Sequence, residues 1–409
     1  MRVLWFTNTP SNYSNSNQYK GGGWISSLES LITLSQDIEL GICFLMNGQP
    51  EEKKVGGTTY FPIRDPYKGS RIQRYKNLFS DLNVIDQTII SDCMRVVEKF
   101  QPDFIHIFGT EGVFGLLTEQ VGIPVLIHLQ GLLNPIFNAY LPPFVSWKDY
   151  LFSDKRPNKI KMRYEERRQW KHSCKRELTI LSHALHLCGR TEWDQKITSL
   201  LSPKSQYHHV GEILREEFYQ PGERTTPSFP TIVSTLSDHP IKGTDTILKT
   251  ARLLKENGFE NFKWIVYGSS HPYFAIKSTG IDPQDVNVSF MGTADAQTLR
   301  QSLLSATVFV HPSYIDNSPN SVCEAQILGC PVIVTDVGGK ASLVKHGENG
   351  FLVPSNDPYQ TAYYIKKLHE DATFNTLMGS YARETALFRH DKKRVLSQLK
   401  TVYRLLANS

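Results

Sequence analysis

Residues 307–335 read TVFVHPSYIDNSPNSVCEAQILGCPVIVT, and this stretch decides the predicted fold. Its first part, 307–310, is a short β-branched and aromatic run of the kind that forms a buried parallel strand. A helical stretch follows and ends at Gly329–Pro331, before a second apolar run at 332–335. The spacing therefore predicts one strand–helix–strand unit of a parallel α/β sheet.

The loop that opens this helix is a candidate ligand site. Asn317 or Ser318 is suited to cap the helix, and Pro319 fits its first position. Ligands bind at the carboxyl edge of open parallel sheets, where a helix start offers unpaired N–H groups and a partial positive charge to an anion. Asp316 and Glu324 would then accept hydrogen bonds from sugar hydroxyls, unless they are an ordinary turn residue and a surface acid.

Further strand-like runs alternate with helical patterns along the 409 residues. They lie at 2–6, 38–45, 103–108, 124–129 and 185–189, and then at 231–236, 263–267, 286–290, 307–311 and 332–335. The Pro- and Gly-rich segment 221–230 between the two series is predicted to be a hinge. Apolar residues at 395, 399, 402 and 406 predict a closing amphipathic helix.

Together with Gly338–Gly339 and 347–353, these motifs resemble glycosyltransferase family 4, a family of retaining enzymes. The resemblance covers the whole chain and is strongest between 231 and 355. It implies the GT-B fold, in which two Rossmann-like parallel-sheet domains face each other across a cleft. The implied domains are an acceptor-binding domain at 1–211, a nucleotide-sugar-binding domain at 212–385 and a C-terminal helix at 386–409 that crosses back to the first domain.

The implied activity is transfer of a sugar from a nucleotide-diphosphate donor, UDP- or GDP-linked, to a glycan or a lipid-linked sugar. In the family two glutamates are separated by seven residues, and Asp316 replaces the first of them here. An Arg usually joins the Lys-Gly pair that grips the donor diphosphate. This chain keeps Lys242-Gly243 but has Ser234 and Thr235 where the Arg is expected. The alternative is that Lys242 does not bind the donor and is an ordinary solvated lysine.

The resemblance places the donor site on residues spread over both halves of the chain. They are Gly21, Gly22, Gly23, Thr235, Lys242, Gly243, Gly268, Asp316, Asn317, Ser318, Pro319, Asn320, Ser321 and Glu324. The glycine triplet follows the first strand and is not the G-x-G-x-x-G of dinucleotide enzymes, although three glycines alone are equally typical of a flexible loop.

Gln130 stands where many family members carry a His near the sugar, and an amide cannot act as a general base. A same-face mechanism is therefore favoured, in which the leaving phosphate takes the acceptor proton. The catalytic candidates are Lys242, Asp316, Glu324 and Gln130, and the acceptor-side candidates are His106, Glu111, Gln130, Gly131 and Arg190. A lone His on an apolar strand, such as His106, is more often a core residue.

No cofactor is expected beyond the nucleotide-sugar substrate. The chain has no D-x-D pair, and its six cysteines are scattered without metal-ligand spacing, so no metal is predicted. No apolar run approaches the length of about 18 residues that spans a membrane, and the N-terminus reads as a first strand rather than a signal peptide. We expect a cytoplasmic protein with reduced thiols and no nucleic-acid partner.

Peripheral membrane contact is predicted through 132–176. The segment 132–144 is apolar, and 155–176 holds ten basic residues against two acids, whereas the whole chain has a net charge of +5. An apolar loop beside a basic helix would attract anionic lipid or a lipid-linked pyrophosphate. The alternative is a solvated helix whose aliphatic side-chain stems pack on the protein.

Two other functions use the same motifs. One is a GT-B sugar-nucleotide epimerase or hydrolase, which would give free product without an acceptor. The other is a non-catalytic sugar-nucleotide binding protein, which the absent Arg and His would permit.

Overall fold

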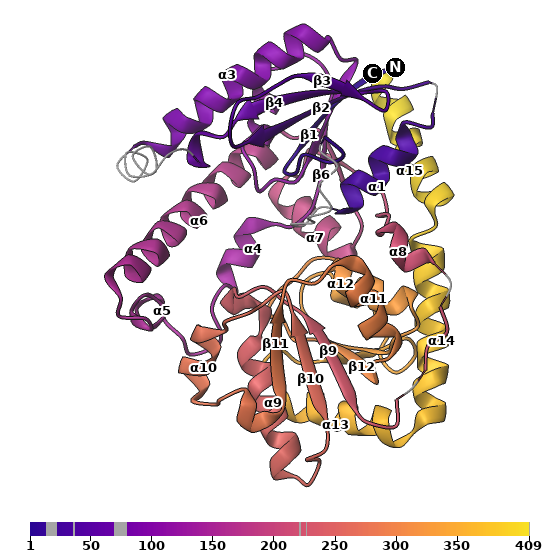
Figure 1. Ribbon diagram of the computed structural model, residues 1–409. Helices are drawn as coiled ribbons and strands as arrows, with labels where there is room; N and C mark the ends of the chain where they lie inside the picture. Colours follow the sequence, from indigo (N-terminus) through magenta and orange to yellow (C-terminus); the bar gives the residue numbers. More distant parts are fainter. Residues whose placement is uncertain (14–22, 36, 69–79, 221, 226, 409) are drawn as a thin grey trace. The chain divides into compact units, whose positions relative to one another are not determined.

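The computed structural model describes residues 1–13, 23–35, 37–68, 80–220, 222–225 and 227–408. The chain forms two compact units. Unit 1 comprises Met1–Pro135, Glu165–Ile213 and Asp391–Ser409, and unit 2 comprises Ile136–Tyr164 and Leu214–His390. Each unit is built on its own sheet (Figure 1). The segment Ile136–Tyr164, which lies within the predicted first domain, groups with unit 2 by its contacts.

The sheet of unit 1 has the strand order β3-β4-β2-β1-β5-β6-β7-β8. Its strands are β1 (Arg2–Thr7), β2 (Glu39–Met46), β3 (Lys53–Val55), β4 (Thr58–Arg64), β5 (Phe104–Phe108), β6 (Val125–His128), β7 (His186–Gly189) and β8 (Gln206–His209). All neighbours pair in parallel except β3 and β4, which form an antiparallel hairpin at one edge.

Both faces of this sheet are covered by helices. The helices of unit 1 include α1 (Gly23–Ile32), α3 (Leu82–Phe100), η2 (Phe114–Glu119), α7 (Glu192–Leu201), α15 (Lys392–Ala407) and most of α6 (Pro157–His183). Apolar side chains of α3, η2 and α6 pack on one face together with Leu4 and Phe6. On the other face, Trp24 of α1 and Tyr403 of α15 contact aromatic rings of β5. The C-terminal helix therefore completes the core of unit 1.

The sheet of unit 2 has the order β11-β10-β9-β12-β13-β14, and every neighbouring pair is parallel. Its strands are β9 (Thr231–Thr235), β10 (Lys263–Tyr267), β11 (Val288–Gly292), β12 (Val308–His311), β13 (Val332–Thr335) and β14 (Phe351–Val353). Alternate residues of one strand face opposite sides, because Val308 and Val310 join one apolar cluster and Phe309 joins the other.

Helices sandwich this second sheet as well. Side chains of α9 (Thr244–Glu256), α10 (Tyr273–Thr279) and α13 (Pro358–Glu370) fill the core on one face. Those of α8 (Glu216–Tyr219), α11 (Ala296–Leu304) and α12 (Asn320–Ile327) fill the other, and α14 (Ala372–Arg389) contributes to both. The shorter elements are α4 (Leu133–Asn138), α5 (Trp147–Phe152), η1 (Pro66–Lys68), η3 (Pro240–Lys242), η4 (Gln284–Val286) and η5 (Lys340–Ser342).

The ten predicted strands are confirmed, and no strand end differs from its predicted position by more than two residues. The closing amphipathic helix is confirmed too, since Val395, Leu399, Val402 and Leu406 are buried. The predicted cap of α12 was wrong: its N-cap is Pro319, no side chain caps it, and the helix begins at Asn320.

None of the helices in the described ranges is both long enough and apolar enough to cross a membrane.

Candidate functional site

Two of the predicted catalytic residues, Lys242 and Asp316, lie together at the carboxyl edge of the unit 2 sheet. Lys242 belongs to η3, in the connection after β9, and Asp316 lies in the loop after β12. Because β9 and β12 are parallel neighbours, their following loops meet at one edge. Lys242 Nζ donates a hydrogen bond of 2.6 Å to Asp316 Oδ2, and the two side chains are 27% and 18% exposed. The pair is thus ordered by the fold yet still open to a ligand.

Two buried basic side chains, His311 and Lys340, neighbour Asp316. His311 ends β12, and its Nε2 lies 3.6 Å from Asp316 Oδ2. Lys340, the first residue of η5, is 0% exposed; its Nζ donates to Ser313 Oγ at 2.7 Å and to the hydroxyl of Thr335. Sequence reasoning missed both residues, although Lys340 directly follows the glycine pair that carried part of the resemblance.

These neighbours set the protonation of the site. Burial alone would raise the pKa of Asp316, but the charge of Lys242, helped by His311 and Lys340, lowers it to about 2. Burial lowers the pKa of Lys340 to about 7, with Asp316 opposing and Lys242 reinforcing the change. Burial and the charge of Lys340 lower the pKa of His311 to about 3. At neutral pH the site therefore holds an ionised Asp316 and a neutral His311.

Two glycines let the loops of this site approach closely. Gly243 has φ +73°, and a Cβ there would lie 2.1 Å from the carbonyl oxygen of Pro312. Gly338 has φ +60°, and a Cβ there would lie 1.8 Å from the carbonyl oxygen of Asp316. Any side chain would displace backbone at both places, so these glycines fix where Lys242 and Asp316 sit.

The helix α12 carries the second predicted acid. Glu324 is 4% exposed and accepts two hydrogen bonds from Arg215, from Nε at 2.7 Å and from Nη2 at 2.8 Å. The carboxylate is therefore a buried, oriented acceptor rather than a surface acid. Arg215 was not predicted as a site residue, because nothing in the sequence links it to a residue 109 positions away.

The remaining donor candidates of unit 2 lie at the start of α12, at the end of β9 and after β10. Asn317 and Ser318 are buried in the loop before α12, and Asn320 and Ser321 form its first turn. Thr235 ends β9, and its Oγ1 is buried with no hydrogen-bond partner among the described residues.

The neighbouring Ser234 is internal: its Oγ donates to Val310 O at 2.7 Å and accepts from Trp264 Nε1 at 3.0 Å. Gly268, with φ +88°, follows β10 and packs against the carbonyl oxygen of Leu236. Gly21 and Gly22 lie outside the described residues, and Gly23 begins α1 in unit 1.

The acceptor-side candidates all lie in unit 1. Burial raises the pKa of Glu111, after β5, to about 7; Glu177 adds to this, while the Gly131 N–H and Arg190 oppose it. Gln130, in the loop after β6, donates from Nε2 to His128 O, the last carbonyl of that strand, at 3.4 Å. Glu111, Gly131 and Arg190 are thus neighbours.

Two buried acids that the sequence reasoning did not single out complete this group. Glu212 Oε2 lies 3.2 Å from Arg190 Nη1. Glu177 accepts from Thr110 Oγ1 at 2.6 Å and from the backbone N–H of Leu133 at 2.8 Å, which fixes the start of α4.

His106, the first of the acceptor-side candidates, belongs to the core of unit 1. It lies in the middle of β5, is 0% exposed, and its Nδ1 is 2.6 Å from Tyr403 Oη of α15. Because α15 covers this part of the sheet, His106 fits the alternative of a core residue better than a role in binding the acceptor.

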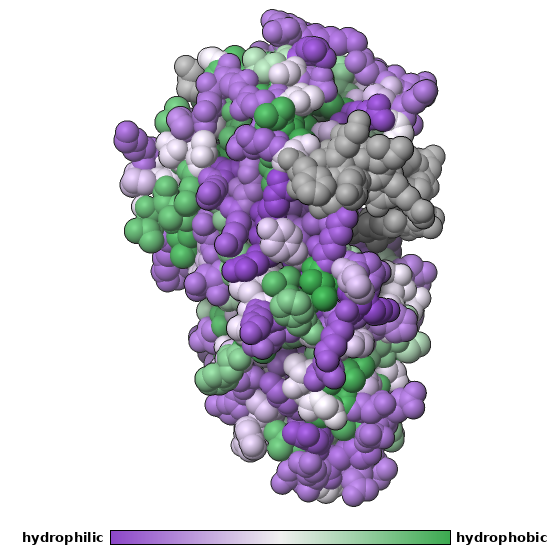
Figure 2. Space-filling model, turned by 90° about the vertical axis from the view of Figure 1, so that its left-hand side faces the viewer, coloured by the Kyte–Doolittle hydropathy of each residue, from purple (hydrophilic) through white to green (hydrophobic). Residues whose placement is uncertain are grey.

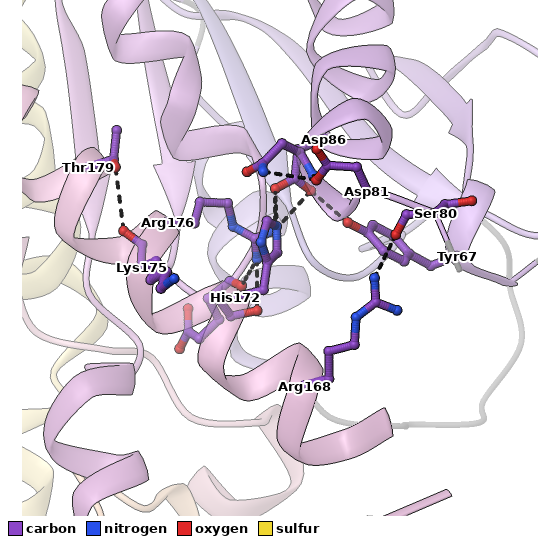
Figure 3. Close-up of polar contacts among 12 residues, drawn as sticks. Tyr67, Ser80, Asp81, Asp86, Arg168, His172, Lys175, Arg176 and Thr179 are labelled. Carbon is purple, nitrogen blue, oxygen red and sulfur yellow. Dashed lines mark hydrogen bonds and ion pairs between the residues drawn. The ribbon is translucent and has the colours of Figure 1, made fainter. Parts of the chain in front are cut away.

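Several basic side chains of the stretch 155–176 form hydrogen bonds or ion pairs within the protein. In unit 1, Arg176 and His172 of α6 converge on Asp86 of α3, at 3.0 and 2.7 Å, as Figure 3 shows. Arg168 donates to Ser80 O at 2.6 Å. In unit 2, Arg163 donates to Tyr150 O at 2.8 Å. Several of the ten bases therefore hold the protein together instead of facing solvent.

Solved structures share this fold over the full chain. Sucrose-phosphate synthase of Thermosynechococcus elongatus superposes with a TM-score of 0.73 at 17% identity, covering 100% of both chains. HepE of Anabaena, solved with UDP-glucose, gives a TM-score of 0.63 at 14% identity and covers 99% of both chains. The two parallel α/β units are those of the GT-B fold, as predicted.

Sequence relatives match over shorter stretches. The capsular polysaccharide biosynthesis glycosyltransferase CapM of Staphylococcus aureus is 27% identical over 165 residues, which are 40% of this chain and 42% of CapM. The chain spans less than half of the length of the curated relatives that it matches. Within this chain, residues 215–385, which contain Lys242, Asp316 and Glu324, match the family model of the glycosyl transferases group 1.

Proposed function

We propose that this protein is a retaining glycosyltransferase that moves a sugar from a nucleotide-diphosphate donor to a glycan or lipid-linked sugar. The observation that carries the proposal is the Lys242–Asp316 pair at the carboxyl edge of the unit 2 sheet, beside the start of α12. The family match over 215–385 contains both residues and supports a glycosyl-transfer chemistry for this edge.

In this proposal unit 2 binds the donor. The diphosphate takes its counter-charge from Lys242 and from the backbone N–H groups of Ser318, Asn320 and Ser321. The Thr235 hydroxyl, which has no hydrogen-bond partner among the described residues, is a further donor. Asp316, ionised at neutral pH, accepts from hydroxyls of the sugar. Arg215 occupies one side of the Glu324 carboxylate, and the lone pairs that remain suit the ribose hydroxyls.

The chemistry breaks the bond between the anomeric carbon and the diphosphate oxygen and forms a bond to the acceptor oxygen on the same face of the sugar. The acceptor proton passes to the leaving phosphate oxygen, because Gln130 offers no base. Lys242 stabilises the charge that develops on the leaving group. With this cation and the helix start in place, the transfer step needs no divalent metal.

Glucose and UDP are bound by HepE, and CapM serves capsular polysaccharide biosynthesis. HepE supports a UDP-sugar as donor here, with a GDP-sugar as the alternative, and CapM supports a growing surface polysaccharide as acceptor. We propose that the transfer takes place on the cytoplasmic side of a membrane. Unit 1 would hold the acceptor, beside Glu111, Gly131 and Arg190, which lie within electrostatic reach of one another.

Contact with a membrane surface is a second part of the proposal. Phe144 is fully exposed, and Phe152, Met162 and Tyr164 are each more than half exposed. These side chains share unit 2 with the exposed bases of 155–161. Figure 2 shows patches of hydrophobic residues set among hydrophilic ones on one side of the molecule. An apolar and basic surface of this kind suits an anionic lipid surface.

A thermal-shift screen against UDP-, GDP-, ADP- and dTDP-sugars, with and without EDTA, tests the donor site, because a ligand that binds the folded state raises the unfolding midpoint. One nucleotide should shift the midpoint regardless of EDTA, and Glu324→Gln should abolish the shift. Glu348→Gln, at an exposed acid of unit 2, is the matched control and should keep it. No shift with any nucleotide would overturn the proposal.

Product analysis separates the possible chemistries once the donor is known. Transfer gives an acceptor glycoside whose anomeric configuration equals that of the donor, which NMR reads directly. Free epimer or free sugar without an acceptor would identify an epimerase or a hydrolase, and binding without turnover a non-catalytic protein.

Liposome co-sedimentation tests the membrane contact. Vesicles with anionic lipid should bind the protein, and Lys155→Gln with Lys161→Gln should release it. The pair Lys171→Gln and Lys175→Gln, on the part of α6 in unit 1, removes the same charge elsewhere and should leave binding unchanged. Equal binding by all variants would remove the membrane proposal.

A further inference from the structure

Three metal-ligand side chains, His106, His128 and Cys188, lie on one face of the unit 1 sheet, next to the acceptor-side candidates Gln130 and Arg190 in the sequence. His128 of β6 is the register partner of Cys188 of β7 and of Phe108 of β5. His106 precedes Phe108 by two residues and therefore points to the same face, because side chains alternate along a strand. Three adjacent parallel strands thus each contribute one side chain that can bind a metal.

The three side chains converge closely. One ligand atom from each of His106, His128 and Cys188 lies within 4.8 Å of the others, and all three residues are 0% exposed. The two imidazole rings are nearly parallel, at 10°, with centroids 5.4 Å apart. Two imidazoles on one tetrahedral metal have centroids about 5 Å apart, since each metal–nitrogen bond is about 2.0 Å long.

The imidazole nitrogens of this cluster are unsatisfied. Both ring nitrogens of His128 and Nε2 of His106 are buried without a hydrogen-bond partner among the described residues. Buried polar atoms of folded proteins nearly always have a partner, and an orphan costs about 1–3 kcal/mol. Each neutral imidazole has one nitrogen lone pair, so one of these nitrogens from each ring, beside the Cys188 thiol, can bind a metal ion.

The second ring nitrogen of His106 is already held. Its Nδ1 lies 2.6 Å from Tyr403 Oη, which also accepts from Trp5 Nε1 at 2.9 Å. A metal-ligating His commonly uses its other nitrogen in this way, and the contact fixes the ring with Nε2 toward the cluster. Arg190, whose charge acts on His128, pairs with Glu212 at 3.2 Å, so this charge is balanced locally.

We propose that His106, His128 and Cys188 bind one Zn²⁺ ion in the core of unit 1. Two imidazoles and a thiolate are ligands that Zn²⁺ and Cu⁺ share. Binding replaces the thiol proton of Cys188, which leaves to solvent, by the metal. The ion joins three central strands and, through His106 and Tyr403, the terminal helix. Its role is structural, and it takes no part in sugar transfer.

Metal analysis of the full chain, purified without chelator, tests this proposal. Inductively coupled plasma mass spectrometry should find about one zinc per chain, and one copper instead would identify the other ion with the same ligands. Replacement by Co²⁺ should give a thiolate-to-metal absorption band, which only a cysteine ligand produces. The variant Cys188→Ala should lose both the metal and the band.

The matched control is Cys93→Ala, at a buried cysteine of α3 in the same unit that is outside the cluster. It should keep the full metal content. If Cys188→Ala fails to fold, the Co²⁺ spectrum of the wild-type protein still decides. Absence of bound metal together with absence of the band after incubation with Zn²⁺ or Co²⁺ would overturn the proposal. Neither result depends on the donor site, which lies in unit 2.

Discussion

Arg215 and Glu324 form a bidentate ion pair inside unit 2, with N–O distances of 2.7 and 2.8 Å. Glu324 is nearly fully buried, and the Arg215 side chain is 16% exposed. Removing one partner leaves a buried charge without compensation, which costs about 3–5 kcal/mol, whereas removing both costs much less. We therefore expect Arg215→Met to be strongly destabilising and Arg215→Met with Glu324→Met to be less so than the sum of the single changes.

Urea unfolding of the four proteins in this double-mutant cycle measures the coupling. Additive effects would show that the two side chains do not stabilise each other. In the double variant, donor binding should be lost even where the fold is retained, because the ribose acceptor is gone; a retained thermal shift would instead remove Glu324 from the donor site.

Lys242 is expected to act on the rate rather than on stability. Its pair with Asp316 is partly exposed, and such pairs contribute about 0–1 kcal/mol to folding. A preorganised cation at a leaving group is worth about 100-fold or more in turnover. Lys242→Met should therefore lower kcat by at least about 100-fold with little change in the unfolding midpoint, in a steady-state assay with the identified donor.

Lys249→Met provides the comparison for this experiment. Lys249 lies in the neighbouring helix α9 and pairs with Asp245 at 2.8 Å, with a similar side-chain exposure of 33%. It should lose little activity. Equal losses in the two variants would mean that general charge in this region, and not the position of Lys242, supports turnover.

The architecture was largely predictable because strand periodicity and turn residues are local signals. In unit 2 the buried strands are nearly continuous apolar runs, as parallel sheets require, so their positions could be read directly. The hairpin of β3 and β4 was missed, although Gly56-Gly57 between two short runs is the usual signal for it, and both glycines have positive φ. The edge strand β8 is polar and carries no such pattern.

The site was predictable only in part, because its contacts are long-range. The loop containing Asp316 and the lysine of Lys242-Gly243 were found from motifs, and their pairing follows from the order of parallel strands. Arg215 and the buried Lys340 could not be assigned in this way, since burial and partners depend on how distant segments pack. The same holds for His106, His128 and Cys188, whose spacing along the chain resembles no metal motif.

Lys340 should make stability depend on pH. Burial lowers its pKa from 10.5 to about 7, so between these values the unfolded chain binds a proton that the folded chain does not hold. Stability rises with pH wherever the unfolded state binds more protons. The free energy of unfolding of the wild-type protein should therefore rise from pH 7 to 10 relative to that of Lys340→Met, and the difference should be flat below pH 7.

Urea titrations at several pH values, on both proteins and on Lys345→Met, measure this difference. Lys345 is a nearby lysine whose side chain is 73% exposed, so its removal should leave the slope of the wild type unchanged. A Lys340→Met variant that keeps the wild-type slope would show that this amine is charged in the folded protein.

Gly243 offers a test of how the donor site is held in place. Alanine at φ +73° costs about 1–2 kcal/mol in backbone strain, and its Cβ would also lie 2.1 Å from the Pro312 carbonyl oxygen. Gly258 has a similar φ of +78° but open space around it, so Gly258→Ala carries the strain without the collision. Gly243→Ala should therefore destabilise more than Gly258→Ala in urea unfolding. It should also raise the KM for the donor, because the displaced loop moves Lys242 away from Asp316. If the two variants lose the same stability and bind the donor equally, the close approach of the loop at 243 to Pro312 does not position the site.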